Sequence, residues 1–246
     1  MDQTNPCAAL IPCRNEALAL PRLLEEVRCF LPAVVVVDDG SRDATGRIAR
    51  QMGAECVGLW PGQGKGAALQ AGFQRLQELG FSHAVTLDGD GQHSPQDIPR
   101  FLSCRQNTGA DLVVGSRMMT AGTMPWPRRA ANRAMSLCLS FYAGRALPDS
   151  QCGFRLVDLR RARQAGAATR HFEFESEMLV TFVRRGFRVE FVPIQTIYRG
   201  ERSKIRPLSD TWRWLRWYAA SFRETTRGRF RTHSPCLRGN SVCAGK

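Results

Sequence analysis

The feature that most constrains the fold is a repeated order of strand, polar loop and helix in the first half of the chain. Five short apolar segments, expected as strands, lie at residues 7–12, 34–37, 54–57, 84–87 and 112–114. The second of them is an all-valine run, which is typical of a parallel strand buried on both faces. Segments with apolar residues three and four positions apart separate them and predict helices. This alternation predicts an α/β fold with a mostly parallel, Rossmann-like sheet flanked by helices.

Polar clusters follow most of these strands directly. Cys13 to Glu16 comes after the first strand, Asp38 to Ser41 after the second, and Gly115 to Arg117 after the fifth. In open α/β sheets, ligands bind at the carboxyl ends of the strands. We therefore expect one functional site that is assembled from several loops.

The fourth strand ends in two carboxylates, Asp88 and Asp90, with a glycine between them. Residues i and i+2 of an extended segment point to the same side, so both carboxylates can converge on one point. Their repulsion would be relieved by a hard cation such as Mg²⁺ or Mn²⁺, which oxygen ligands suit. Gln92 or His93 could complete the ligand set. The alternative is a polar turn, because Asp and Gly are common turn residues.

A glycine-rich stretch, residues 62–66, precedes the next helical pattern and contains Lys65. Backbone N–H groups at a helix start and a lysine could bind phosphate. The stretch is neither a P-loop nor a dinucleotide-binding fingerprint, because the required spacing is absent. A phosphate-binding loop and a flexible turn both fit this pattern.

Beyond residue 120 the alternation ends. A helix is expected after residues 125–129 and through about Tyr142, and a polar loop at residues 149–155 enters a strand. A second helix is expected from Phe172 to Arg185, with acidic residues near its start that either cap the helix or serve a site. Two short strands are expected at residues 189–192 and 195–198.

The last part of the chain is rich in tryptophan and arginine. Residues 208–223 predict a helix that either lies in the headgroup layer of a membrane or packs its tryptophans on the main domain. From residue 225 on, the chain is basic and without periodicity, which predicts disorder. We therefore expect a main domain over residues 1–205, an amphipathic helix over 206–224 and a basic tail over 225–246.

Composition limits the location and the partners. Of 246 residues, 43% are hydrophobic, which suffices for a core, and nine cysteines without a CxxC pair favour reduced thiols. No signal peptide and no apolar run of about 18 residues is found. These features predict a cytoplasmic protein with peripheral contact to the membrane face. The net charge is +13, and residues 199–246 hold 12 Lys/Arg against three Asp/Glu, which favours an anionic partner.

Several of these motifs, taken in order, resemble those of family 2 glycosyltransferases, which have the nucleotide-diphospho-sugar transferase (GT-A) fold. The nearer resemblance is to the dolichol-phosphate (polyprenyl-phosphate) mannose synthase branch. The matching motifs span about residues 8–205 and lie at residues 11–16, 37–41, 64–66, 87–93, 115–117, 149–155 and 173–175, the last before the 192–194 strand.

The resemblance implies a role for each matching residue. The nucleotide-sugar would contact Pro12, Asn15, Glu16, Asp38, Asp39, Lys65, Asp88 and Gly89. Mg²⁺ or Mn²⁺ would be held by Asp88, Asp90 and Gln92. The acceptor phosphate would be gathered, or the donor covered, by Arg117, Arg128, Arg129, Asn132, Arg202 and Lys204.

Three features depart from the family pattern. Arg14 precedes the Asn-Glu pair where tyrosine is frequent, and Asn132 stands where a serine is common. No carboxy-terminal transmembrane pair follows the domain, so membrane contact would come from the Trp/Arg helix.

The expected activity is metal-dependent, inverting transfer of a hexose, mannose from GDP-mannose in the first place, to a polyprenyl or dolichyl phosphate. Asp90 and Asp149 are the expected catalytic residues. An alternative acceptor is a hydroxyl of a lipid or glycan, with a UDP- or GDP-sugar as donor and Asp149 as general base. A donor-binding regulator without catalysis, and a basic nucleic-acid-binding protein, are two further alternatives. The carboxylates at the strand ends would repel a polyanion, so we expect no nucleic-acid partner.

Overall fold

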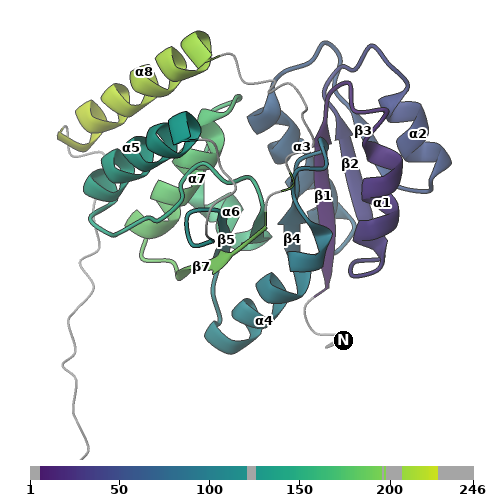
Figure 1. Ribbon diagram of the computed structural model, residues 1–246, viewed down its shortest axis with the longest axis horizontal. Coiled ribbons are helices and arrows are strands. Elements are labelled where there is room, and N and C mark those ends of the chain that lie inside the picture. The colour runs from purple at the N-terminus through teal and green to yellow at the C-terminus, as the bar shows by residue number, and fades with distance from the viewer. Residues whose placement is uncertain (1–5, 121–125, 196, 198–206, 227–246) are drawn as a thin grey trace, which may run out of the picture.

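A seven-stranded sheet forms the centre of the computed structural model, which describes residues 6–120, 126–195, 197 and 207–226 (Figure 1). Its strands lie in the order β3-β2-β1-β4-β6-β5-β7. They are β1 (Cys7–Cys13), β2 (Val34–Asp38), β3 (Glu55–Gly58), β4 (His83–Thr86), β5 (Leu112–Ser116), β6 (Arg155–Asp158) and β7 (Val189–Pro193).

The sheet is mostly parallel, as the sequence predicts. Strands β1, β2, β3 and β4 pair in parallel, and so do β5 and β7. Strand β6 lies antiparallel between β4 and β5, with Arg155 opposite Thr86. This register places the loop that precedes β6 next to the loop that follows β4, so the motifs at residues 88–93 and 149–155 meet at one edge.

Helices flank the sheet and pack on its strands through apolar faces. Helices α2 (Thr45–Gln51) and α3 (Lys65–Glu78) pack on the β1–β3 side, and α4 (Ile98–Thr108) on β5 and β7. Helix α7 (Glu173–Arg184) contacts four other helices. The remaining elements are α1 (Leu20–Arg28), the 3-10 helix η1 (Pro95–Asp97), α5 (Trp126–Ala143), α6 (Leu159–Ala165) and α8 (Pro207–Thr226).

The structure differs from the expected elements in three places. The strand expected at 195–198 is wrong for its described residues, because Gln195 N donates to Asp97 Oδ2 (2.8 Å) and Ile197 N to Gln92 O (2.9 Å) instead of to a strand. Helix α6 follows β6 without having been expected. Helix α8 extends to Thr226, and the rest of the tail lies outside the described residues.

None of the helices in the described part of the chain is both long and apolar enough to cross a membrane.

Candidate active site at the carboxyl end of the sheet

The loop after β4 carries the two carboxylates and is held tightly in place. Gly89 packs so closely against β1 that an added Cβ would lie 2.6 Å from Cys13 Sγ. The next carboxylate, Asp90, accepts a hydrogen bond at Oδ1 from Gln92 N (3.0 Å). Gly91 turns the chain with a φ of 69°, a conformation that favours glycine. The loop geometry therefore depends on both glycines of the Asp-Gly-Asp-Gly motif.

His93 holds this loop in place through one hydrogen bond and one ring contact. Its Nδ1 accepts a hydrogen bond from Asp88 N (3.2 Å), and its ring stacks on Phe154 at a centroid distance of 5.2 Å. Burial lowers the pKa of His93 to about 4, so the imidazole is neutral near pH 7. Because Nδ1 is engaged by the backbone, His93 fits a supporting role, and Gln92 remains the better candidate for the third ligand.

Lys65 lies between two carboxylates at the start of α3. Its Nζ is 2.5 Å from Asp88 Oδ1 and 3.1 Å from Glu175 Oε1. Burial would lower the pKa of Lys65, but the two carboxylates outweigh that effect and raise the pKa above its usual value. Burial would also raise the pKa of Asp88, but Lys65, followed by His93, lowers it to about 2. Asp88 is therefore ionised throughout the neutral range.

Gly153 makes room for this charged cluster. A Cβ at residue 153 would lie 2.7 Å from Glu175 Oε1, 2.8 Å from Lys65 Nζ and 3.0 Å from Asp88 Oδ1. Real Cβ atoms essentially never approach other heavy atoms that closely. Glycine at this position thus lets the loop before β6 close over the three charged side chains.

The residues expected at the nucleoside join the loops after β1 and β2. Asn15, in a left-handed conformation with a φ of 53°, donates its N–H to Ser41 Oγ (2.9 Å) and accepts at Oδ1 from Arg42 N (2.8 Å). Glu16 N donates to Thr45 Oγ1 (2.8 Å). Pro12 lies in β1, directly before these loops. The three residues thus lie together, at the edge where the sequence places a site.

The two aspartates after β2 act on neighbouring loops. Asp38 accepts a hydrogen bond from Ser41 N (3.0 Å), which closes its own loop. The buried Asp39 carboxylate accepts from Gln63 N (2.5 Å) and, with both oxygens, from Gly64 N (3.0 and 3.1 Å). Asp39 therefore fixes the glycine-rich stretch and, through it, the start of α3 at Lys65.

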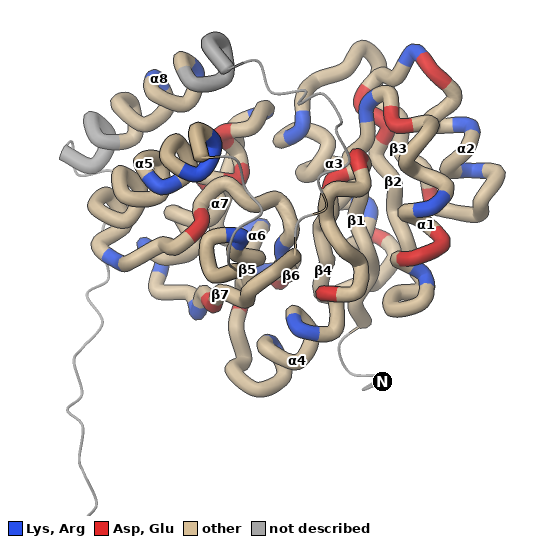
Figure 2. Tube along the Cα trace, viewed as in Figure 1, with Lys and Arg blue, Asp and Glu red and all other residues tan. Residues whose placement is uncertain are grey.

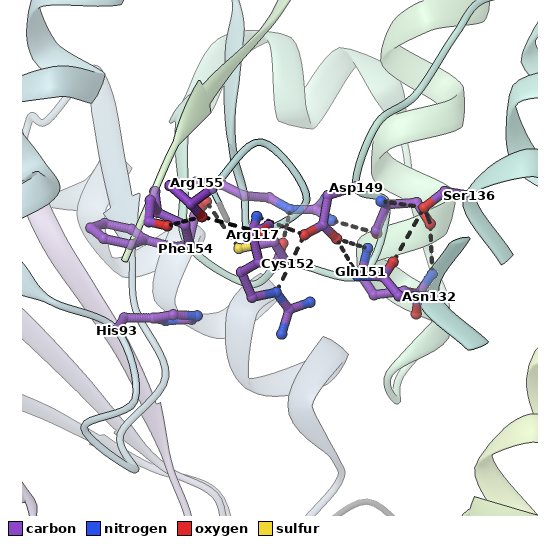
Figure 3. A network of polar contacts seen from close by, with 12 residues as sticks. His93, Arg117, Asn132, Ser136, Asp149, Gln151, Cys152, Phe154 and Arg155 are labelled. Carbon is purple, nitrogen blue, oxygen red and sulfur yellow. Dashed lines mark hydrogen bonds and ion pairs between the residues drawn. The ribbon is translucent and has the colours of Figure 1, made fainter. Parts of the chain in front are cut away.

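Arg117 is held by Asp149 at the end of β5 (Figure 3). Asp149 Oδ2 accepts from Arg117 N (3.0 Å) and from Arg117 Nε (3.3 Å). Asp149 Oδ1 accepts from Asn132 Nδ2 (3.0 Å) and from Gln151 N (3.1 Å). Asp149 is 0% exposed. These contacts orient a guanidinium group beside the Asp88 loop, where it also helps to lower the pKa of Asp88.

The geometry of Asp149 bears on its expected role as a general base. A general base must reach the proton that it removes, by a direct hydrogen bond or through one water. Asp149 is completely buried, and each of its carboxylate oxygens accepts two hydrogen bonds. In this structure the contacts of Asp149 are those of a residue that positions Arg117.

A chain of hydroxyl and amide groups extends from Asp149 to α8. Gln151 Nε2 donates to Ser150 Oγ (2.8 Å) and to Ser176 Oγ (3.2 Å). Ser176 also accepts from Trp214 Nε1 (3.1 Å), and Trp214 is buried. Helix α8 is thus bonded to the same network that holds Arg117.

Two buried charged residues near the site lie in motifs that the sequence singles out, but the sequence assigned neither of them a contact. Arg155 donates to three backbone carbonyls, those of Cys152 (2.8 Å), Glu175 (2.6 Å) and Ser150 (3.1 Å), and so fixes the loop over the Asp88 cluster. Glu175 is the second partner of Lys65. The sequence held a signal for each residue. Arg155 is an arginine in a short apolar strand, and Glu175 belongs to an acidic cluster that is larger than helix capping requires.

The four remaining basic residues that were expected at the acceptor are either exposed or outside the described residues. Arg128 and Arg129 are exposed in the first turn of α5. Arg202 and Lys204 lie outside the described residues.

The oxygen donors at the Asp88 loop fit a hard divalent cation. Within the described residues, no group of three His, Cys, Asp or Glu side chains gathers around one point. Mg²⁺ needs no such group, because it binds through one or two carboxylates together with substrate phosphates and water. Asp88, Asp90 and the Gln92 amide are the residues of this loop that would supply such donors.

Comparison with solved structures places the fold in a known class. Glucosyl-3-phosphoglycerate synthase from Mycobacterium tuberculosis, in a complex with Mn²⁺ and UDP, matches with a TM-score of 0.68 at 19% identity and covers 93% of this chain and 82% of its own. A second complex of that protein, with Mg²⁺ and UDP, matches with a TM-score of 0.67. The fold is thus the GT-A fold, and the expected fold class is confirmed.

Sequence comparison then gives the family. The model of glycosyl transferase family 2 matches residues 8–192. Undecaprenyl-phosphate mannosyltransferase from Micrococcus luteus is 34% identical over 203 residues, which cover 77% of this chain and 83% of the relative. Polyprenol monophosphomannose synthase from Mycolicibacterium smegmatis is 30% identical over 205 residues, 78% of this chain and 77% of the relative. This chain belongs to glycosyl transferase family 2 and is a glycosyltransferase.

Proposed function

We propose that this protein transfers a hexose, mannose from GDP-mannose in the first place, from a nucleotide-sugar to a polyprenyl phosphate. The observation that carries this proposal is the pairing of two charged groups at one sheet edge. An acidic loop suited to a cation and a diphosphate lies beside Arg117, a cation oriented by a buried carboxylate.

The donor half of the site is assigned to the loops after β1, β2 and β4. Pro12, Asn15 and Glu16, with Asp38 or Asp39, would contact the nucleoside. Asp88, Asp90 and Gln92 would hold Mg²⁺ or Mn²⁺, and such an ion neutralises charge that develops on a leaving diphosphate. Lys65 would add a fixed positive charge next to the diphosphate.

The acceptor half is assigned to Arg117 with Asn132 and the arginines at the start of α5. A lipid phosphate oxyanion is already a nucleophile, so its attack on the anomeric carbon requires no general base. The burial of Asp149 supports this acceptor over a hydroxyl, which would need a base within hydrogen-bond reach. Arg117 would bind the phosphate by charge-assisted hydrogen bonds, and Asp149 keeps its guanidinium in place.

The names of the relatives support a polyprenyl-phosphate acceptor and leave several donors to be tested. Two of the relatives described above are named for mannose transfer. Another, from Methanococcus voltae, is named as a UDP-N-acetylglucosamine–dolichyl-phosphate transferase and is 27% identical. A donor panel should therefore contain both GDP- and UDP-sugars.

The test is release of nucleoside diphosphate from that panel, with Mg²⁺ or Mn²⁺ and a short polyprenyl phosphate in detergent. We expect GDP release from GDP-mannose by the parent and loss of about 100-fold or more in Asp90→Ala, which removes an expected cation ligand. If no donor turns over, or if Asp90→Ala matches the parent, the proposed function is wrong.

A further inference from the structure

Helix α5 has an unusual distribution of side chains. A surface helix normally buries its apolar face and exposes its polar one. In α5 the buried side includes Asn132 and Ser136, which bond to Asp149 and to Ser150 (Figure 3). Its exposed side carries Trp126, Leu137 and Phe141, with 79%, 63% and 80% of their surface accessible.

The exposed apolar residues of α5 form one continuous stripe. They follow one another at intervals of three or four residues, so they fall within an arc of roughly 80° on the helix. All of them are exposed: Trp126, Ala130, Ala134, Leu137 and Phe141. A stripe of this kind on a helix calls for an apolar surface to cover it.

Helix α8 lies beside α5 and repeats the pattern (Figure 1). Tyr142 Oη donates to Ser221 O and Tyr218 Oη to Cys138 O, both at 3.0 Å, which joins the C-terminal end of α5 to the C-terminal half of α8. The inward side of α8 buries Trp214, whereas Trp212 and Leu215 are exposed. We call the exposed sides of α5 and α8 together the α5/α8 face.

The α5/α8 face is positively charged, which favours an anionic partner. Arg128, Arg129 and Arg133 on α5 and Arg216 on α8 are exposed, and residues 126–143 and 212–221 contain no Asp or Glu (Figure 2). Aromatic and apolar side chains mixed with arginine match the headgroup layer of a membrane, where anionic lipids attract each basic residue.

We propose that the α5/α8 face docks on the surface of an anionic lipid bilayer, with the apolar stripe inserted among the headgroups. This proposal rests on the proposed function, because an enzyme must reach the bilayer to act on a polyprenyl phosphate that is held there. The inner side of α5 holds Asn132 and, through it, Asp149 and Arg117. Docking of the outer side would thus place the acceptor-binding group next to the membrane surface.

The test is sedimentation of the full chain with vesicles that contain no polyprenyl phosphate. We expect binding to phosphatidylcholine vesicles that contain phosphatidylglycerol, and weaker binding to phosphatidylcholine alone. The double variant Trp126→Ser/Phe141→Ser should reduce the partition coefficient on the mixed vesicles by about tenfold or more, because two large apolar side chains no longer insert. Arg133→Gln/Arg216→Gln should reduce binding to the mixed vesicles and leave binding to phosphatidylcholine nearly unchanged.

Trp60→Ser is the matched control, because Trp60 is 77% exposed but lies after β3, at the opposite edge of the sheet. It should bind vesicles like the parent, and thermal unfolding should verify that all variants are folded. Equal vesicle binding by the parent and the Trp126→Ser/Phe141→Ser variant would overturn the proposal. The proposal would also be overturned if the parent forms a dimer without lipid and the double variant is monomeric, because the α5/α8 face would then bind a second copy of the chain. Transfer to a short polyprenyl phosphate in detergent tests the proposed function separately, because that assay needs no vesicle.

Discussion

The ammonium group of Lys65 lies between carboxylates from two distant parts of the chain. Asp88 belongs to the loop after β4, and Glu175 to the first turn of α7. Both carboxylates share the single positive charge, so either can retain it when the other binds a cation. Glu175 is thus placed to take over Lys65 when Asp88 binds a metal ion.

This sharing predicts opposite effects of two substitutions on cation binding. In Glu175→Gln the charge of Lys65 acts on Asp88 alone, so the Kd for Mn²⁺ should rise roughly 3- to 10-fold, or about 1 kcal/mol. In Lys65→Met the competing charge is gone, so Mn²⁺ alone should bind more tightly while nucleoside diphosphate binds more weakly. Calorimetric titration with Mn²⁺, with and without nucleoside diphosphate, measures both effects.

Glu173→Gln is the control, because it removes the same charge from the same turn of α7 outside the Lys65 ion pairs. If Glu175→Gln and Glu173→Gln change the Kd equally, Glu175 has no specific role in positioning Lys65.

The residues that sequence predicts at the site are those that follow strands along the chain. Asp88, Asp90, Asp38 and Asp39 could be predicted because the carboxyl ends of parallel strands meet at one edge. The pairing of Lys65 with Glu175 could not be predicted, because residues 110 positions apart in sequence meet only through the packing of α3 on α7. The burial of Asp149 could not be predicted either, because it depends on how α5 packs around it.

Helix α8 packs its buried tryptophan on the main domain, which is one of the two alternatives that its sequence leaves open. It packs on the domain through Trp214, whose Nε1 donates to Ser176 Oγ (3.1 Å), and it exposes Trp212 and Leu215 on the other side. The periodicity of tryptophan and arginine alone could not divide these residues between the two sides. The neighbouring helices decide which tryptophan is buried.

This packing predicts the effect of removing one hydrogen bond. Trp214→Phe keeps most of the ring packing but leaves buried Ser176 without that donor, so the free energy of unfolding should fall by about 1–2 kcal/mol. Trp217→Phe, whose ring lies 6.3 Å from that of Trp214, leaves the bond from Trp214 to Ser176 intact and should cost less. Urea denaturation followed by circular dichroism measures both. If Trp214→Phe is as stable as the parent, the bond between α8 and α7 contributes nothing to the fold.

At the scale of the whole molecule, the sheet order decides where the site forms. The five-fold alternation predicts strands β1 to β5 and their helices, and the structure agrees with small shifts at the ends. The antiparallel insertion of β6 between β4 and β5 does not follow from local patterns, because its register depends on pairing with strands far away in sequence. This insertion brings the Asp149–Arg155 loop over Asp88, Lys65 and Glu175.

The central strand β4 predicts a pH dependence of global stability through His83. Burial, with a smaller effect of Arg105, lowers the pKa of His83 from 6.5 to about 4, although Asp158 and Asp111 oppose the shift. The unfolded chain then binds a proton that the folded chain does not, so stability is present above about pH 6.5 and is lost as the pH falls toward 4. The loss has a ceiling of roughly 3 kcal/mol, at about 1.4 kcal/mol per pKa unit.

Urea denaturation at pH 7 and pH 5 measures this loss in the parent and in His83→Gln. The difference between the two pH values should be smaller in His83→Gln, because glutamine takes up no proton. An equal difference in both proteins would assign the pH dependence to other groups.

The central proposal is that the acceptor is an ionised phosphate, that Arg117 binds it, and that no general base is needed. The most direct measurement is transfer of labelled hexose from the best donor to a short polyprenyl phosphate, compared with the matching polyprenol, in the same detergent. We expect labelled lipid with the phosphate and none with the alcohol, and a large loss of transfer in Arg117→Gln. Transfer to the alcohol at a comparable rate would contradict this proposal, because a hydroxyl acceptor requires a base that Asp149 does not provide in this structure.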